Sequence, residues 1–412
     1  MSFARNMKCP VCGVEETLNL WLSKCPSCSS SLLDIQYDMD ALSRYADRDE
    51  IEKRPSLVLK KWREFLPIED PSKIVSIGER ETFLIQCDSL AKQVGVGKLY
   101  IKDETAHSTA SYKDRSMAMA MTSAVEAGAK TVAIVSTGNA GAASAAYAAR
   151  ANLRCVVLVP STASPEKLVQ ILMYGGTVIR VEGGFNDAVD LYLKGLDRFG
   201  WYPTGYGNQY RYEGDKTLAY EIAQSFHWKI PDRVVCPTGS GQLISRVYKG
   251  FAELKELGWI EELPRLTSVQ PAATNALELA FRQKKKRADR ITPEPTIASG
   301  IAVADPKEFG ILALDGLRAT NGSILSLTEE EIRESQRLLA RHAGIFAEPA
   351  GAVGIVGIRK LRERGEMGND EVVVVVITGH GLKDPGSVRA VADEVINIPF
   401  DFEALRQIAE RW

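Results

Sequence analysis

The sequence lacks long apolar runs and any excess of charge of one sign. Its longest apolar run, Val372 to Ile377, is far too short to cross a bilayer. The formal net charge is −2, which predicts no overall attraction to nucleic acid or to an anionic membrane. Residues 1–6 lead into cysteines rather than an apolar segment, so no secretory signal is visible. We therefore expect a cytoplasmic protein with neither a nucleic-acid nor a membrane partner.

Cysteine is also sparse, and the spacing of the seven cysteines does not indicate a disulfide framework. Three of them, Cys87, Cys155 and Cys236, are scattered among apolar or strand-like neighbours. Free cysteine in such surroundings is usually buried, so we expect these three to be reduced core thiols.

The other four cysteines have the spacing of a zinc ribbon. They form two Cys-x-x-Cys pairs, Cys9 with Cys12 and Cys25 with Cys28, separated by twelve residues. Each pair places two thiolates on one tight turn, and four thiolates fill a tetrahedral shell without room for water. We therefore predict a structural Zn²⁺ rather than free thiols or a catalytic metal.

A zinc ribbon can also belong to a binding protein that docks nucleic acid or a partner protein. Here the ribbon carries few basic residues, namely Arg5, Lys8 and Lys24. Three cations are too few for a phosphate-binding surface. A stabilising cap or a protein-interaction module fits this segment better.

From about residue 97 onward, short apolar strands alternate with helix-length segments. This alternation predicts parallel sheets covered by helices on both faces. We expect helices over Lys113–Ala127, Ala140–Ala151, Pro165–Tyr174, Asn186–Phe199, Asp215–Phe226 and Gly241–Leu257. The expected strands are Leu99–Ile101, Thr131–Val135, Cys155–Val159, Thr177–Val181, Arg233–Cys236, Leu266–Gln270 and Val372–Ile377. The last of these has no alternation, which is typical of a central strand buried on both faces.

The chain is long enough for two α/β lobes and a small accessory module. We expect the boundaries to be 1–36 for the zinc ribbon, 37–96 for the start of the large lobe, 97–204 for the small lobe, 205–395 for the rest of the large lobe and 396–412 for a C-terminal tail.

Three polar loops follow predicted strands, where ligands of open parallel sheets bind. The loop Thr238-Gly239-Ser240-Gly241-Gln242 enters a predicted helix and offers backbone N–H groups to a phosphate. A glycine-rich turn from strand to helix without any ligand is an equally good interpretation of this loop alone. The loop lacks the spacing of a Walker A or dinucleotide motif.

The other two loops present side-chain donors. Ser136, Thr137 and Asn139 precede an alanine-rich helix and could grip a carboxylate or a phenolic oxygen, although they could also simply cap the helix. Thr378 follows the deepest strand and could face a ring nitrogen. His380 lies between two glycines, where a structural role is favoured over proton transfer.

Lys113 precedes a predicted helix in the run Ser111-Tyr112-Lys113-Asp114-Arg115. A free lysine amine is protonated at neutral pH, so a nucleophilic role requires desolvation or a neighbouring cation. A lysine of this kind, near polar loops, indicates an enzyme that holds a carbonyl cofactor as a Schiff base.

These motifs together resemble the threonine synthases. The resemblance rests on the Lys113 run, on Ser136 to Gly141, and on the runs Arg211 to Thr217, Glu348-Pro349-Ala350 and Thr378 to Pro385. It covers the chain from roughly residue 75 to 390, in the family's order of motifs. It implies a two-lobed enzyme of fold type II that uses pyridoxal 5'-phosphate, acts on a small amino-acid substrate and forms a homodimer.

The resemblance also implies a role for each matching position. Lys113 would anchor the cofactor and move protons, and Asn139 would contact its 3'-oxygen. Thr378 would face the pyridine nitrogen, and the 238–242 loop would hold the cofactor phosphate. Ser136, Thr137 and Arg211 would bind the substrate. The family's reaction converts O-phospho-L-homoserine and water to L-threonine and phosphate.

The departures from the family concern the substrate. Gly205 and Tyr206 stand where many synthases have an Asn-Ser pair that holds the substrate phosphate. Losing two hydrogen bonds to a charged group would weaken binding about a hundredfold unless Tyr206, Lys216 or Arg211 compensates. Paralogues that share the cofactor apparatus are therefore alternatives, among them cysteate synthase and amino-acid ammonia-lyases. A homologue that binds the cofactor without turnover is another, although the intact Lys113 argues against it.

Overall fold

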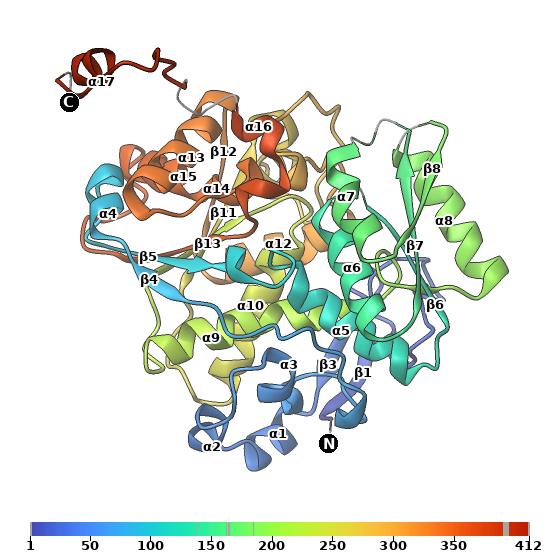
Figure 1. Cartoon of the computed structure of the whole chain (residues 1–412). Helices are drawn as coiled ribbons and strands as arrows, with labels where there is room; N and C mark the ends of the chain where they lie inside the picture. The colour runs from blue at the N-terminus through green and yellow to red at the C-terminus, as the bar shows by residue number, and fades with distance from the viewer. Residues whose placement is uncertain are drawn as a thin grey trace.

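The computed structural model describes residues 2–136, 138–161, 163, 165–183, 185–389 and 395–410. Its strands form three sheets, with the orders β2-β1-β3, β12-β11-β10-β13-β5-β4 and β8-β7-β6-β9. The six-stranded and four-stranded sheets belong to two lobes that lie side by side, and the three-stranded sheet lies beneath them at the N-terminus (Figure 1). The predicted two-lobed α/β architecture is thereby confirmed.

The six-stranded sheet forms the core of the large lobe. Its strands are β4 (Leu84–Gln86), β5 (Lys98–Asp103), β10 (Arg233–Pro237), β11 (Arg265–Pro271), β12 (Ser323–Leu327) and β13 (Val372–Ile377). All neighbouring pairs are parallel except β4 with β5 at one edge. The valine run of β13 lies between β10 and β5 and is buried beyond its first residue, as the absence of alternation predicts.

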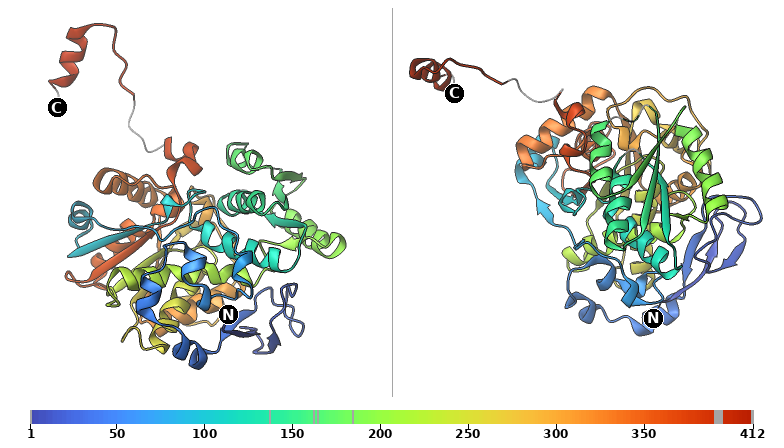
Figure 2. Two further views of the ribbon diagram at one scale, coloured as in Figure 1. Left: turned by 60° about the horizontal axis from the view of Figure 1, so that its bottom comes forward. Right: turned by 45° about the vertical axis from the view of Figure 1, so that its right-hand side comes forward.

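The four-stranded sheet of the small lobe is parallel throughout. Its strands are β6 (Thr131–Val135), β7 (Arg154–Pro160), β8 (Thr177–Val181) and β9 (Tyr202–Pro203). The helices around it are α5 (Lys113–Glu126), α6 (Asn139–Arg150), α7 (Pro165–Met173) and α8 (Phe185–Phe199). The right-hand view of Figure 2 shows helices on both sides of this sheet, which is why its strands tolerate apolar residues on both faces.

Most helices of the large lobe pack on the six-stranded sheet, and α9 packs on α10. They are α4 (Asp88–Val94), α9 (Thr217–Ser225), α10 (Gln242–Glu256), α11 (Ala276–Arg282), α12 (Lys307–Ala319), α13 (Glu329–Ala343), α14 (Pro349–Ala352), α15 (Gly354–Glu363) and α16 (Pro385–Arg389). Helix α13 starts with a capping box between Thr328 and Glu331, which satisfies two backbone donors at its first turn.

The N-terminal segment forms its own small sheet from β1 (Ala4–Lys8), β2 (Glu15–Thr17) and β3 (Asp34–Tyr37). The charged stretch after it folds as two short helices, α1 (Met39–Tyr45) and α2 (Arg48–Glu52), followed by α3 (Val58–Lys61). Two aspartates, Asp38 and Asp47, cap α1 and α2 with their side chains. Local capping therefore divides a stretch that has only a weak helical pattern.

The predicted elements agree with the structure except at their ends and in one helix. That helix was expected from Asp215, but α9 begins at Thr217, because Tyr210–Lys216 form a 3-10 turn packed against α5. Gly214 permits this packing, since a Cβ atom there would lie 2.2 Å from the carbonyl oxygen of Arg115. Strand pairing places β5 in the six-stranded sheet, although residue 97 was the expected start of the small lobe. The lobe boundaries otherwise stay predictions.

The C-terminal helix α17 (Phe402–Ala409) lies apart from the body in every view (Figures 1 and 2). None of its residues is buried. No helix in the described part of the chain is long and apolar enough to span a membrane.

A buried ion network connects Arg115 of α5 to Glu104, which follows β5, and to Glu221 of α9. Arg115 donates to Glu104 at 2.6 and 2.8 Å and to both carboxylate oxygens of Glu221, and Lys102 reaches Glu221 at 2.7 Å. The side chains involved are at most 1% exposed. Burial alone would raise the pKa of Glu104, but Arg115 and His107 hold it well below its usual range. Opposite charges in contact make this burial tolerable.

We predict that Glu221→Ala lowers the free energy of unfolding by about 3–5 kcal/mol, because it leaves the charges of Arg115 and Lys102 buried without their partner. Urea unfolding of wild type and variant measures this difference. The matched control is Glu50→Ala, which removes an exposed partner of Lys53 and should leave the midpoint unchanged. Equal midpoints for Glu221→Ala and wild type would contradict the role of the network.

Candidate active site

The three loops singled out in the sequence line one cavity of about 840 Å³ between the lobes. Ser136, Gly138 and Asn139 contribute from the small lobe, and residues 238–242 and Thr378 from the large lobe. Each loop follows the carboxyl end of a parallel strand, β6, β10 or β13. The convergence expected from sheet topology is therefore confirmed.

Lys113 is the first residue of α5 and lines this cavity. Its ammonium lies 4.1 Å from the ring centroid of Tyr112 and donates to the hydroxyl of the same residue. The pKa of Lys113 is lowered to about 8: burial and the nearby charge of Arg211 lower it, and the opposing charges of Asp215 and Glu348 offset part of their effect. A substantial fraction of this amine is thus neutral near physiological pH, as a nucleophilic lysine requires.

The loop 238–242 has the geometry of a phosphate cradle. Gly241 adopts φ +94° and precedes Gln242, the first residue of α10. A Cβ atom at Gly241 would lie 2.6 Å from the Cβ of Ala313, and one at Gly239 would lie 2.9 Å from Val303. Only glycine fits both positions, and the loop's backbone N–H groups stand at the start of a 15-residue helix.

The side chain of Gln242 has a partner within the protein. It donates to Asp215 at 2.6 Å, so the backbone of Gln242 rather than its amide is available to a phosphate. Asp215 is fully buried, and its other carboxylate oxygen has no hydrogen-bond partner among the described residues. Burial raises the pKa of Asp215, while Lys113 lowers it. The charge of Asp215 in turn raises the pKa of Lys113 and so opposes the effect of burial.

Asn139 is held in place from the opposite lobe. Its side-chain N–H donates to Glu348 at 2.8 Å, and Glu348 is buried, which raises its pKa. Gly379 lies against this pair, because a Cβ there would be 2.4 Å from a carboxylate oxygen of Glu348. The hydroxyl of Ser136 accepts from the backbone N–H of Gly138 at 3.3 Å. Thr137, the third predicted donor of this loop, lies outside the described residues.

Thr378 is buried at the end of β13, and its carbonyl accepts the N–H of Tyr112 at 3.0 Å, which ties this loop to the lysine loop. His380 does not line the cavity. Its Nδ1 accepts the N–H of Leu382 at 3.1 Å, so it caps the following turn, as the favoured structural interpretation holds. His107 pairs with Glu104 at 3.0 Å within the buried network.

Arg211 is the predicted site residue that the structure does not bring to the cavity wall. It is buried and donates to the carbonyl of Thr204 at 2.9 Å. Tyr206 does line the cavity, and Tyr192 fixes it by donating to its carbonyl oxygen at 2.7 Å. Tyr206 therefore lines the cavity, whereas Arg211 is held away from it by its hydrogen bond to Thr204.

Sequence reasoning missed several residues of the cavity wall. Glu348 could have been found, because it lies within a motif that carries the family resemblance. Lys383 likewise lies in such a motif, the run Thr378 to Pro385. The remaining charged residues come from segments without any motif: Lys167, Asp190, Arg290, Asp305 and Lys307. Two of the lysines link the lobes, since Lys167 pairs with Asp384 at 3.0 Å and Lys383 contacts Gln170 of α7.

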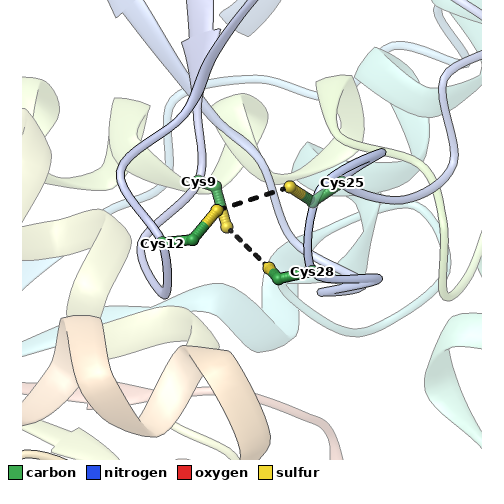
Figure 3. A group of neighbouring side chains, drawn as sticks. All are labelled: Cys9, Cys12, Cys25 and Cys28. Atoms are coloured by element: carbon green, nitrogen blue, oxygen red, sulfur yellow. Dashed lines mark hydrogen bonds between the residues drawn. The ribbon is translucent and has the colours of Figure 1, made fainter.

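The four N-terminal cysteines converge on one point from two turns (Figure 3). Their sulfur atoms all lie within 4.8 Å of one another, with Cys9 to Cys28 at 3.5 Å and Cys12 to Cys25 at 3.7 Å. A tetrahedral zinc with Zn–S bonds of ~2.3 Å places sulfurs about 3.8 Å apart. The donor set and its spacing therefore fit this ion.

A family model described as pyridoxal-phosphate dependent enzyme matches residues 75–379. This match spans all three cavity loops and Lys113, and the chain belongs to that family.

Within the family, the relatives of this chain are threonine synthases. The threonine synthase of Methanocaldococcus jannaschii is 39% identical over 97% of this chain and 98% of its own length. That of Methanosarcina acetivorans is 38% identical over 98% of both chains. The fold alone is shared with threonine deaminase isoform 2 of Solanum lycopersicum, at a TM-score of 0.66 and 20% identity over 84% of this chain and 94% of that one.

We predict that cofactor-free protein takes up pyridoxal phosphate at a rate that rises about tenfold from about pH 7 to about pH 9 and then levels off, because the neutral amine reacts. The growth of visible absorption after mixing measures this rate. Asp215→Asn should move the midpoint to lower pH, since it removes an anion that stabilises the charged lysine. A rate that still rises steeply above about pH 10 would show that Lys113 has an ordinary pKa.

Proposed function

We propose that this protein is a pyridoxal-phosphate-dependent lyase that converts O-phospho-L-homoserine and water to L-threonine and phosphate. The observation that carries the proposal is the near-full-length similarity to threonine synthases together with a lysine of lowered pKa at the meeting point of the three loops.

The residues divide between cofactor and substrate. Lys113 would hold the cofactor and move protons at the substrate's α and β carbons. The 238–242 backbone would hold the cofactor phosphate, Asn139 its 3'-oxygen and Thr378 its ring nitrogen. Ser136, with Thr137 beside it in the sequence, would bind the substrate carboxylate. Arg211 does not line the cavity, and its charge lowers the pKa of Lys113. It therefore has no direct contact with the substrate in this proposal.

The cofactor supplies an electron sink for the carbanion chemistry. A neutral threonine hydroxyl opposite the ring nitrogen makes that sink weaker than a carboxylate would. This favours elimination and replacement over transamination. The buried Asn139–Glu348 pair keeps the amide fixed, because Glu348 accepts one of its two N–H groups and leaves the other free.

We also propose that the cysteine cluster holds one structural Zn²⁺. The two turns have equivalent hydrogen bonds: Gly13 donates to the carbonyl of Cys9, and Ser29 to that of Cys25, both at 2.9 Å. Both donors have positive φ, +76° and +60°. Two matching turns that aim four sulfurs at one point support an ion there.

A cytoplasmic homodimer remains part of the proposal. Apolar side chains of α7, namely Val169, Leu172 and Met173, are exposed and share one face of the helix. Exposed apolar surface of this kind is common at protein interfaces.

The substrate test is turnover by the cofactor-loaded protein. We expect phosphate and L-threonine from O-phospho-L-homoserine, both absent with Lys113→Ala, which should also lack the visible absorption band of the loaded enzyme. Phosphate release is followed colorimetrically and threonine by chromatography. Turnover of phosphoserine with sulfite, or deamination of another amino acid, without any threonine from O-phospho-L-homoserine would overturn this assignment in favour of a paralogue.

The metal test is elemental analysis of the purified protein. We expect one zinc per chain, and its loss in Cys12→Ser, because three thiolates hold the ion more weakly than four. Cys87→Ser, which changes a cysteine far from the cluster, should keep its zinc. A zinc-free wild type would refute the proposal.

A further inference from the structure

The substrate's phosphate needs its own partners in the cavity. The backbone N–H groups of residues 238–242 are proposed to bind the cofactor phosphate, so they are not available to the substrate. The substrate phosphate carries close to two negative charges of its own. Lys216, one compensating residue considered from the sequence, is fully buried and pairs with Glu213 at 3.0 Å and Glu253 at 2.8 Å. Arg211 is committed to the carbonyl of Thr204. Neither lines the cavity.

Five cationic side chains do line the cavity, and their existing partners separate them. Lys113 is assigned to the cofactor. Lys167 is held by Asp384 and by Ser299, each at 3.0 Å. Lys383 is half-buried and contacts Gln170 of α7, and its ammonium donates to the carbonyl of Thr109 at 3.0 Å.

Arg290 and Lys307 are the two that remain. Neither side chain forms an ion pair or hydrogen bond with any residue in the described part of the chain. Both are exposed to the cavity. Asp305 lies between them in the sequence, but it accepts the backbone N–H of Lys307 at 3.2 Å rather than the ammonium. The lining thus holds two cations that no carboxylate of the described residues pairs with, and such cations attract an anion.

The ammonium of Lys307 lies 5.7 Å from the ring centroid of Tyr206, which is 41% exposed. Both residues line the cavity. Tyr206 lies three residues after β9 of the four-stranded sheet, whereas Lys307 begins α12 in the large lobe. An aromatic ring at this distance orients the ammonium without neutralising its charge.

We propose that Lys307 and Arg290 bind the phosphate group of the substrate, with Tyr206 holding Lys307 in place. This deepens the proposed function and rests on it. Arg290 can offer two parallel N–H groups to phosphate oxygens, and Lys307 a point charge. In this chain the specificity for a phosphorylated substrate then comes from residues 290–307. Tyr206 stands where many synthases have an Asn-Ser pair, and it contributes to phosphate binding by positioning Lys307.

The experiment compares Lys307→Met and Arg290→Met with wild type as cofactor-loaded enzymes. We expect each to raise KM for O-phospho-L-homoserine and to weaken the binding of inorganic phosphate by about tenfold to a hundredfold, as lost charge-assisted hydrogen bonds do. Visible absorption and kcat should stay near wild type. Lys307→Arg should restore most of the affinity, and Tyr206→Leu should cause a smaller loss. Calorimetry with inorganic phosphate measures binding without turnover.

The matched control is Lys286→Met, which removes an exposed lysine outside the cavity and should change neither KM nor phosphate binding. Unchanged phosphate affinity in both Lys307→Met and Arg290→Met would overturn the proposal. So would loss of the cofactor's visible band, which would assign these cations to the cofactor phosphate. If wild type fails to act on O-phospho-L-homoserine, the proposed function fails, and the calorimetric phosphate titration still decides the inference.

Discussion

The position of Lys113 depends on the buried ion network around Arg115. Two carboxylates from different segments, Glu104 and Glu221, grip one guanidinium at the start of α5. Because these charges are shielded from water, none of them can move without exposing or isolating another. The lysine two residues earlier is therefore fixed relative to both lobes. The network also ties β5 and α9 together through Lys102.

Opposite electrostatic conditions exist within a short stretch of α5. Arg115 is neutralised fully by its partners, whereas Lys113 faces a cavity where burial and the charge of Arg211 disfavour its protonated form. The same burial that makes the ion network costly to break thus makes the neighbouring amine reactive. Asp215 limits this effect, and its hydrogen bond to Gln242 links the lysine's surroundings to the 238–242 loop.

The residues proposed for the cofactor and those proposed for the substrate phosphate come from different parts of the cavity. The former stand on loops that follow parallel strands, and the Asn139–Glu348 hydrogen bond joins two of these loops. Of the latter, Tyr206 and Arg290 lie outside the named helices and strands, and Lys307 is the first residue of α12. Loops of this kind can change their side chains without disturbing the sheets. This explains how one cofactor scaffold serves enzymes with different amino-acid substrates.

The local features could be predicted from the residues alone: most helices, the buried valine strand, the cysteine turns and the lysine with its three loops. Each of these depends on side-chain periodicity or spacing within a few residues, or on a family motif. Short or irregular elements such as β4, β9 and β12 went unforeseen, because pairing with neighbouring strands rather than their own residues stabilises them. Which charges are paired depends on contacts that form only in the folded chain. Arg211, Lys216, Arg290 and Lys307 are chemically similar in the sequence. In the fold, Arg211 is committed to the carbonyl of Thr204 and Lys216 to Glu213 and Glu253. Arg290 and Lys307 have no ion pair or side-chain hydrogen bond among the described residues.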